Sequence, residues 1–246
     1  IYEPLVKIGT AATNFALNAQ LPVEGLIRAT VFDHFCGGVS EEDCLHIIKE
    51  LGSYGVQSIL DYSVEGKVEE NQFDLAVEKN LEILSFIKSR EKIPFAVFKP
   101  TALGSSDIFF KVSEGLELNE SEKNAYSRIV ERYHTLCSKA KELNLKLLVD
   151  AEESWLQKAA DDLCIEMMKV YNTEQAIVYN TYQMYRWDKM KDLEDLFDLA
   201  NQHSFFPGIK LVRGAYMEKE RKRASEKGYT SPICKNKQET DVNFDK

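Results

Sequence analysis

The chain has 246 residues, of which 44% are hydrophobic and 29% are charged, and its formal net charge is −9. These values fit a globular protein with a sizeable core, and the negative charge argues against nucleic acid as the main partner. No apolar stretch approaches the roughly 18 residues of a membrane-spanning helix, and no basic segment followed by an apolar one predicts a signal peptide.

Segments typical of strands and helices alternate along the chain. The expected strands cover 28–35, 56–63, 94–99, 145–150, 176–182 and 208–214. The expected helices cover 40–55, 71–90, 121–144, 154–171, 187–202 and 217–227. Regular alternation of this kind predicts parallel strands joined by right-handed crossovers.

The number of strand–helix units leaves two architectures open. Six units suit either a doubly wound sheet or an incomplete (β/α)8 barrel, which needs eight strands and typically about 250 residues. Residues 227–246 are polar and predict no strand. We therefore expect either a barrel that lacks its last strands or a barrel whose remainder lies outside these residues.

Polar residues stand at the ends of the predicted strands, where α/β folds place their chemistry. They are Asp33 and His34, Asp61 and Tyr62, Lys99, Asp150, Asn180 and Tyr182, and Lys210 and Arg213. Each has an ordinary alternative explanation, such as a loop anchor for Asp61, a solvated rim for Lys99, or a helix cap for Glu152 and Glu153. At successive strand ends, however, stand Lys99, Asp150, Asn180, Lys210 and Arg213. Three cations and one aspartate in this subset predict a site for an anionic ligand.

Two neighbouring cations in this set need not share one anion. A strand alternates its side chains between two faces. Lys210 and Val212 therefore point to one side, and Arg213 points to the other. We expect each charge to have its own partner.

Other kinds of site have little support in the sequence. The five cysteines show no CxxC pair, and no HxH or HxxxH pair occurs, so neither a disulfide framework nor a metal site is predicted. Free thiols in apolar or helical contexts favour a reducing compartment. Neither GxGxxG nor GxxxxGK[ST] nor GxSxG is present, which excludes the common dinucleotide, P-loop and nucleophile-elbow motifs.

Six segments, in order along the chain, resemble the proline dehydrogenase family and its monofunctional, eukaryotic-type branch in particular. They are FDHFCGG, LDYSVEGK, FKPTALG, LLVDAEE, VYNTYQMY and KLVRGAYMEKER, and they span residues 32–221. The resemblance implies a distorted TIM-like (β/α)8 barrel, a single domain over residues 1–246 that lacks the last strands and the C-terminal helix. It also implies FAD held non-covalently at the strand ends, hydride transfer from C5 of L-proline to flavin N5, and 1-pyrroline-5-carboxylate as product.

The resemblance also implies roles for residues that meet the substrate. Lys99 resembles the lysine that holds the substrate carboxylate, and Asp150 resembles the active-site aspartate. Lys210 stands where many bacterial members carry an arginine that contacts flavin N5, so both Asp150 and Lys210 are assigned to catalysis. Tyr216 resembles a tyrosine that lines the proline pocket, and Glu65 resembles a gate carboxylate.

A second group of residues resembles the FAD-binding positions of the family. Ala151 would back the flavin, and Asn180 would take the place of a glutamine that hydrogen-bonds the isoalloxazine ring. The segment for the FAD phosphates and ribityl chain would be Arg213, Gly214 and Ala215. Asn180 is one methylene shorter than glutamine, and Lys210 offers a point charge instead of a forked donor.

Several alternatives stay open at this level. The same scaffold could serve a hydroxyproline dehydrogenase, or an inactive barrel fragment that acts as a binding module. An aldolase-like barrel with Lys99 as a Schiff base has less support. The resemblance implies a membrane quinone as electron acceptor and hence peripheral membrane contact. The expected location is the bacterial cytoplasm or the cytoplasmic face of the inner membrane, with the matrix side of the mitochondrial inner membrane as the alternative. The sequence does not predict an oligomeric state.

Overall fold

The computed structural model describes residues 3–19, 21–23, 25, 28–32, 36–62 and 69–246. The chain divides into two compact units, Ile1–Val56 and Gln57–Lys246. The described elements of the first unit are the helix α1 (Glu3–Asn18), the π-helical segment η1 (Arg28–Phe32) and the helix α4 (Leu45–Ser53).

The first expected strand, over 28–35, is wrong in the part that the structure describes, because Arg28–Phe32 is helical. β-branched and aromatic residues favour a strand only where a neighbouring strand offers pairing. Asp33 and His34 lie outside the described residues. The next helix is expected over 40–55 with Ser40 as its N-cap, but α4 begins only at Leu45. Ser40 Oγ accepts from Asp43 N at 3.2 Å and Asp43 Oδ2 accepts from Ser40 N at 3.1 Å, so these capping contacts form in the turn that precedes the helix.

The second unit contains one parallel sheet of five strands in the order β1-β2-β3-β4-β5. The strands are β1 (Leu60–Asp61), β2 (Phe95–Phe98), β3 (Lys146–Val149), β4 (Val178–Gln183) and β5 (Ile209–Val212). A doubly wound sheet reverses its strand order at a switch point. The order here follows the chain without reversal, which is the winding of the TIM-like (β/α)8 class.

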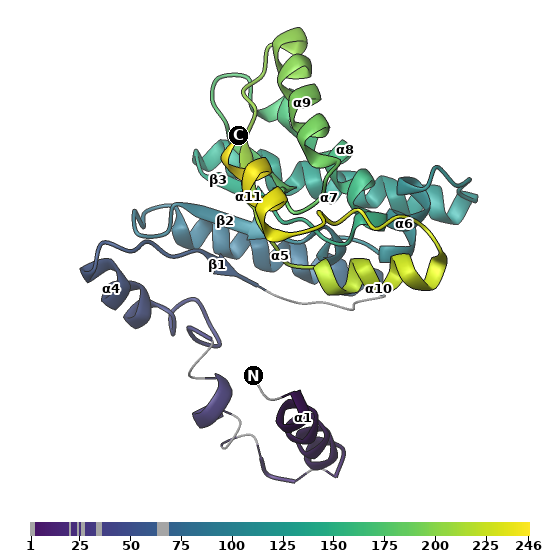
Figure 1. Ribbon diagram of the computed structural model, residues 1–246. Coiled ribbons are helices and arrows are strands. Elements are labelled where there is room, and N and C mark those ends of the chain that lie inside the picture. Colours follow the sequence, from purple (N-terminus) through teal and green to yellow (C-terminus); the bar gives the residue numbers. More distant parts are fainter. Residues whose placement is uncertain (1–2, 20, 24, 26–27, 33–35, 63–68) are drawn as a thin grey trace. The chain divides into compact units, whose positions relative to one another are not determined.

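Helices follow every strand of this sheet, and four of them contact it. The helical segments are α5 (Glu70–Ile87), the 3₁₀ turn η2 (Pro100–Ala102), α6 (Ser106–Ser113), α7 (Glu120–Leu143), α8 (Ser154–Tyr171), α9 (Lys189–His203), α10 (Met217–Lys227) and α11 (Lys237–Asp245). The helix α5 lies against β2 (Figure 1). The helix α7 contacts β3, and α8 and α9 contact β4. Among the described residues, no helix has the length and hydrophobicity that crossing a bilayer requires.

Three helices, α1, α6 and α11, were not expected from the sequence. The last two are short, and each begins with a capped N-terminus. Ser105 Oγ accepts from Asp107 N at 3.2 Å at the start of α6. Asn236 Oδ1 accepts from Glu239 N at 2.9 Å at the start of α11, inside the polar region that predicted no regular structure.

The core lies between the sheet and its helices. The ring of Phe98 on β2 meets that of Tyr133 on α7 edge to face at 5.1 Å, and Leu136 and Val149 are fully buried beside them. Because strand residues alternate between faces, the neighbours Lys99 and Asp150 point to the opposite side of the sheet. That second side is where the polar strand ends meet.

Candidate functional site

Three of the sequence-predicted site residues form an ion-paired group at the strand ends, here called the strand-end cluster: Lys99, Asp150 and Lys210. Lys99 Nζ lies 3.2 Å from Asp150 Oδ2, and Lys210 Nζ lies 2.5 Å from Asp150 Oδ1. The exposed side-chain fractions are 18% for Lys99, 20% for Asp150 and 33% for Lys210. The cluster is therefore sheltered but reachable.

The register of the sheet explains why these three meet. Phe98 pairs with Val149, and Asp150 N donates to Phe98 O at 3.0 Å, so the next residues along, Lys99 and Asp150, are neighbours. Thr181 pairs with Lys210 on the following strands. Val149 also pairs with Asn180, which puts Asp150 level with Thr181. Lys99, Asp150 and Lys210 therefore stand at one level of neighbouring strands and on one face.

The electrostatics of Lys99 favour its charged form. Burial alone acts to lower its pKa and is the largest single influence, but the charge of Asp150, its hydrogen bond and the charges of Asp61 and Glu152 together raise the pKa above its usual value. A Schiff-base lysine needs the opposite shift. The aldolase-like alternative is therefore not supported, and Asp61 at the end of β1 lies within electrostatic reach.

One carboxylate between two ammonium groups leaves the strand-end cluster with a net positive charge. Charged hydrogen-bond donors of this kind bind carboxylate or phosphate oxygens strongly when they are partly desolvated. The arrangement can therefore hold the anionic group of a small ligand next to a carboxylate that accepts hydrogen bonds.

Arg213 lies just beyond β5 and has a different partner from Lys210, as the alternation of strand faces predicts. Its Nη1 lies 3.2 Å from Asp241 Oδ1, and its guanidinium carbon lies 4.4 Å from the ring centroid of Phe244, both on α11. The side chain is 51% exposed. A third cation thus stands outside the sheltered cluster.

The segment after Arg213 links β5 to α10. Gly214 and Ala215 are exposed, and Tyr216 is half-buried with Lys219 Nζ 5.9 Å from its ring centroid. A Cβ on Gly214 would meet only the flexible Met217 Sδ, at 3.3 Å. The fold itself therefore does not demand glycine here, and the open backbone is available to a ligand. Ala151 is buried next to Asp150, and Glu65 lies outside the described residues.

Asn180 is placed differently from the expectation. Its side chain is fully buried, and its Nδ2 donates to Asp161 Oδ1 on α8 at 2.8 Å. It therefore lies on the helix-facing side of β4 and does not face the strand-end cluster. The residues of β4 on the cluster side are Thr181, whose Oγ1 donates to Val149 O at 2.8 Å, and Gln183, whose Nε2 donates to Glu152 O at 2.7 Å.

The expected helix caps of α8 are also wrong. The Glu152 carboxylate accepts from Thr101 N at 2.8 Å, and Glu153 pairs with Lys219. Glu220 of α10 caps α8 instead, because its carboxylate accepts from Ser154 N at 2.6 Å and from Ser154 Oγ at 2.7 Å. The sequence separation of 66 residues hides this cap from any local pattern.

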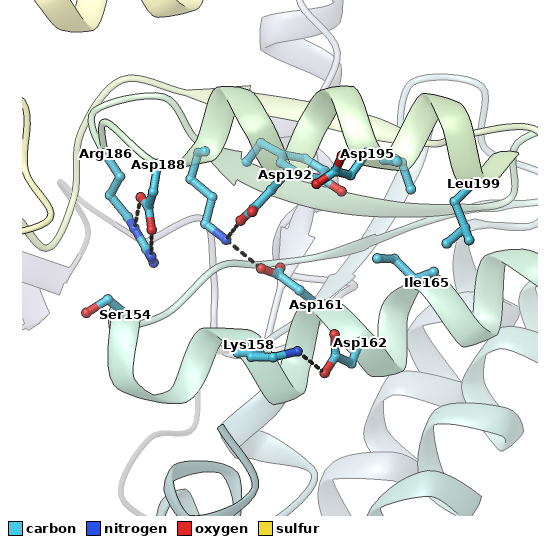
Figure 2. A pocket seen from close by; sticks show the side chains of 13 residues that line it. Ser154, Lys158, Asp161, Asp162, Ile165, Arg186, Asp188, Asp192, Asp195 and Leu199 are labelled. Carbon is cyan, nitrogen blue, oxygen red and sulfur yellow. Dashed lines mark hydrogen bonds and ion pairs between the residues drawn. The ribbon is translucent and has the colours of Figure 1, made fainter. Parts of the chain in front are cut away.

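A second polar region lies away from the strand ends, between α8 and α9. It surrounds a cavity of about 440 Å³ (Figure 2). Lys189 Nζ lies 2.7 Å from Asp161 Oδ2 and 2.6 Å from Asp192 Oδ2, and we call these three residues the helix-side cluster.

The other cations that line this cavity are paired as well. Arg186 binds both carboxylate oxygens of Asp188, at 3.0 and 2.6 Å, and Lys158 binds Asp162 at 2.7 Å (Figure 2). Each lining cation therefore has a carboxylate partner. This leaves the cavity without the excess positive charge of the strand-end cluster.

Metal and thiol chemistry find no support in the part of the chain that the structure describes. It contains no group of three or more histidine, cysteine or acidic residues placed to hold a metal ion. All five cysteines are free, and burial raises the pKa of the Cys137 and Cys164 thiols. Thiols of this kind are inert.

Comparison with known proteins agrees with the resemblance. The family model described as proline dehydrogenase matches residues 44–246. The carbapenem antibiotics biosynthesis protein CarD of Pectobacterium carotovorum subsp. carotovorum is 35% identical over 199 residues, which cover 81% of this chain and 53% of that protein. Human mitochondrial proline dehydrogenase 1 is 34% identical over 163 residues, which cover 65% of this chain and 26% of the human one. The chain thus spans about half or less of the length of these relatives.

Solved structures show a similar fold. The structure of proline utilization A (PutA) from Bdellovibrio bacteriovorus, inactivated by N-propargylglycine, superposes with a TM-score of 0.75 at 18% identity and covers 89% of this chain and 24% of that one. The match to the family model extends from α4 to the end of α11 and includes every residue of the strand-end cluster. The chain belongs to the proline dehydrogenase family.

Proposed function

We propose that this protein oxidises L-proline to 1-pyrroline-5-carboxylate with bound FAD as the hydride acceptor. The observation that carries the proposal is the strand-end cluster, in which Lys99 and Lys210 enclose Asp150 at the carboxyl ends of parallel strands. This is the edge at which barrel enzymes hold their substrates. We infer the identity of the substrate from membership of the proline dehydrogenase family.

The cations and open backbone at this edge fit FAD. FAD has a pyrophosphate and a flavin ring, and the ring becomes anionic when it is reduced. Lys210 would stand beside the ring, where its charge stabilises the reduced form. Arg213, half-exposed beyond the strand, would hold the phosphates together with the open backbone of Gly214 and Ala215. Arg213 would then exchange or share its present partner, Asp241. Ala151 would pack behind the ring.

The substrate would be fixed by the other side of the cluster. Lys99 would hold the carboxylate of proline through a charge-assisted hydrogen bond, and Tyr216 would line the ring pocket. Bound FAD would supply the hydride acceptor for proline C5, at its N5 atom, and Lys99 and Asp150 would fix the substrate in position for that transfer. The amine must be neutral when the hydride leaves, and in this proposal its proton passes to water. We retain Glu65 as a gate carboxylate on resemblance alone.

We further propose a quinone as the electron acceptor, and with it peripheral contact with a membrane. The human, Drosophila and Caenorhabditis elegans relatives are named mitochondrial, whereas the Pectobacterium relative is bacterial. The matrix side of the mitochondrial inner membrane and the cytoplasmic face of a bacterial one are therefore both proposed locations. We also propose that residues 1–246 belong to one barrel domain.

The proposal is tested by the colour of the protein. The purified chain supplied with FAD should be yellow, and its flavin band should bleach on anaerobic addition of L-proline. A colourless protein that takes up no FAD would overturn the proposal. Faster bleaching with trans-4-hydroxy-L-proline would shift the substrate to hydroxyproline, and FAD uptake without bleaching by either amino acid would favour a binding module.

A further inference from the structure

Glu152 makes contacts that link separate strand ends of the site. Its side chain is buried, with 6% of the residue exposed. The carboxylate accepts from Thr101 N at 2.8 Å and from Thr101 Oγ1 at 2.9 Å and 2.8 Å. Thr101 stands two residues after Lys99, and Glu152 stands two residues after Asp150. The carboxylate therefore ties the segment after β2 to the segment after β3.

The backbone of the same residue makes two further connections. Its carbonyl oxygen accepts from Gln183 Nε2 at 2.7 Å, at the end of β4. Its amide donates to Gln157 Oε1 at 2.7 Å, on α8, and Gln157 Nε2 donates to Asp161 at 2.7 Å. Gln183 and Gln157 are each 1% exposed. One residue thus joins three strand ends and the following helix, through the part-buried Thr101 and the almost fully buried Gln157 and Gln183.

Burying the Glu152 carboxyl group costs free energy unless hydrogen bonds satisfy its oxygens. Burial, the largest influence, raises the pKa of Glu152, and the hydrogen bonds from Thr101 act against that rise. A buried carboxyl group is retained where its partners satisfy it. A helix-cap role does not explain this one, because α8 is capped by Glu220.

We propose that Glu152 is a positioning residue that sets the spacing between Lys99 and Asp150. Lys99 and Asp150 are separated by 51 residues, and their contact depends on how the two strand ends are held side by side. Glu152 holds Thr101 at a fixed place relative to its own backbone, and Lys99 follows through two rigid backbone units that include Pro100. That Lys99 binds the proline carboxylate rests on the proposed function; the positioning of Lys99 by Glu152 does not.

The chain offers a matched control for this role. Glu153 is the next residue, it is also buried at 8% exposure, and it also carries an ion pair, but its partner is Lys219 on α10. Glu153→Gln removes a charge from the same loop without touching the link to Thr101. Thr101→Val removes a hydroxyl donor from the link without changing any charge.

The first measurement concerns Lys99 itself and needs no activity. The lysines are dimethylated with ¹³C, which keeps their charge, and their methyl signals are recorded by NMR. The signal of Lys99 is assigned by its absence from the spectrum of Lys99→Arg. Glu152→Ala and Thr101→Val should both move that signal, and Glu153→Gln should leave it in place. If Glu152→Ala moves it and Thr101→Val does not, Glu152 acts through its charge alone and the positioning role is wrong.

The second measurement uses the FAD-loaded protein and the split between KM and kcat. Because a misplaced charged donor forfeits much of a charge-assisted hydrogen bond, Glu152→Ala should raise KM for L-proline by about tenfold or more. Thr101→Val should shift KM in the same direction, and Glu153→Gln should change it less than about twofold. Equal losses in Glu152→Ala and Glu153→Gln would overturn the proposal. If the parent protein bleaches with neither amino acid while the Lys99 signal still moves, the proposed function fails and the positioning role stands.

Discussion

The strand-end cluster and the helix-side cluster are mirror images in charge. In the first, the carboxylate of Asp150 lies between two lysines; in the second, the ammonium of Lys189 lies between two aspartates. The central side chains differ in exposure as well, at 20% for Asp150 and 5% for Lys189. Of the two aspartates beside Lys189, Asp161 is 13% exposed and Asp192 is 47% exposed. The two clusters lie on different sides of the same sheet, so they share a fold but not an environment.

The difference lies in how completely each central group is satisfied. Asp161 accepts from Lys189, from Gln157 and from Asn180, so the buried cation and its neighbours form a closed network. Asp150 has two cationic partners that carry more positive charge than it can neutralise, and all three groups are reachable by solvent. A closed buried network stabilises a structure, whereas an open cationic one is suited to a ligand.

The largest effect is expected from Asp161→Ala. This change leaves Lys189 with a single partner and removes the acceptor for Gln157 and Asn180, so unfolding free energy should fall by about 3–5 kcal/mol. Urea unfolding measures it. Asp162→Ala is the control, because this neighbour is 55% exposed and should change stability by less than about 1 kcal/mol. A loss below about 1 kcal/mol for Asp161→Ala would mean that the helix-side cluster is not structural.

Lys99→Ala, in the strand-end cluster, is expected to weaken substrate binding and to leave stability almost unchanged. Removing a charged donor from the substrate carboxylate should raise KM for L-proline by about 10- to 150-fold, with little loss of stability. Steady-state kinetics and urea unfolding separate the two effects. Lys158→Ala, which removes a lysine that is 67% exposed at the cavity rim, should leave KM unchanged. Unchanged proline affinity in Lys99→Ala would show that its assigned role is wrong.

These clusters also show what the sequence could predict. The positions of Lys99, Asp150 and Lys210 followed from strand ends and family segments, because the carboxyl ends of parallel strands meet at one edge. The orientation of Asn180 did not follow, because one residue of register decides which face a side chain takes. Thr181 and Gln183 were missed for that reason, although the period of two along β4 contained the signal.

The remaining errors concern contacts between distant segments. The cap of α8 by Glu220 and the link from Glu152 to Thr101 join residues far apart in sequence. Local capping rules assigned Glu152 and Glu153 to the nearest helix, since they consider only neighbours along the chain. The helical form of Arg28–Phe32 is a similar case, in which strand propensity alone decided the expectation.

A smaller effect, on the affinity for FAD, is expected when the partner of Arg213 is changed. Asp241→Asn frees Arg213 from its carboxylate partner, so the affinity for FAD should rise by about two- to fivefold, as for other exposed pairs. Titration of FAD followed by its fluorescence measures the change, which should shrink as salt is added. Asp245→Asn on the same helix is the control. Weaker FAD binding in Asp241→Asn would show that Arg213 does not hold the phosphates.

The smallest effect is expected in a third ion-paired group, which joins α5 to α7. Arg128 holds both carboxylate oxygens of Glu70 at 2.9 and 2.8 Å, and Arg132 adds a contact of 2.6 Å. The hydrogen bond from Arg128, ahead of those from Arg132, lowers the pKa of Glu70 to about 2. The carboxylate is 44% exposed, so its charge should contribute less than about 1 kcal/mol.

The sign of this contribution follows from the lowered pKa. An unfolded glutamate titrates near pKa 4.3, so the stabilisation by Glu70 is complete above about pH 5 and is lost progressively as the pH falls toward 2. The stability difference between the parent protein and Glu70→Gln, measured by urea unfolding, should therefore shrink from pH 7 to pH 3. Glu78→Gln, an exposed change on the same helix, should show no such trend. A difference that stays constant down to pH 3 would show that the charge of Glu70 does not contribute to stability, and that Arg128 and Arg132 hold the side chain equally well when it is uncharged.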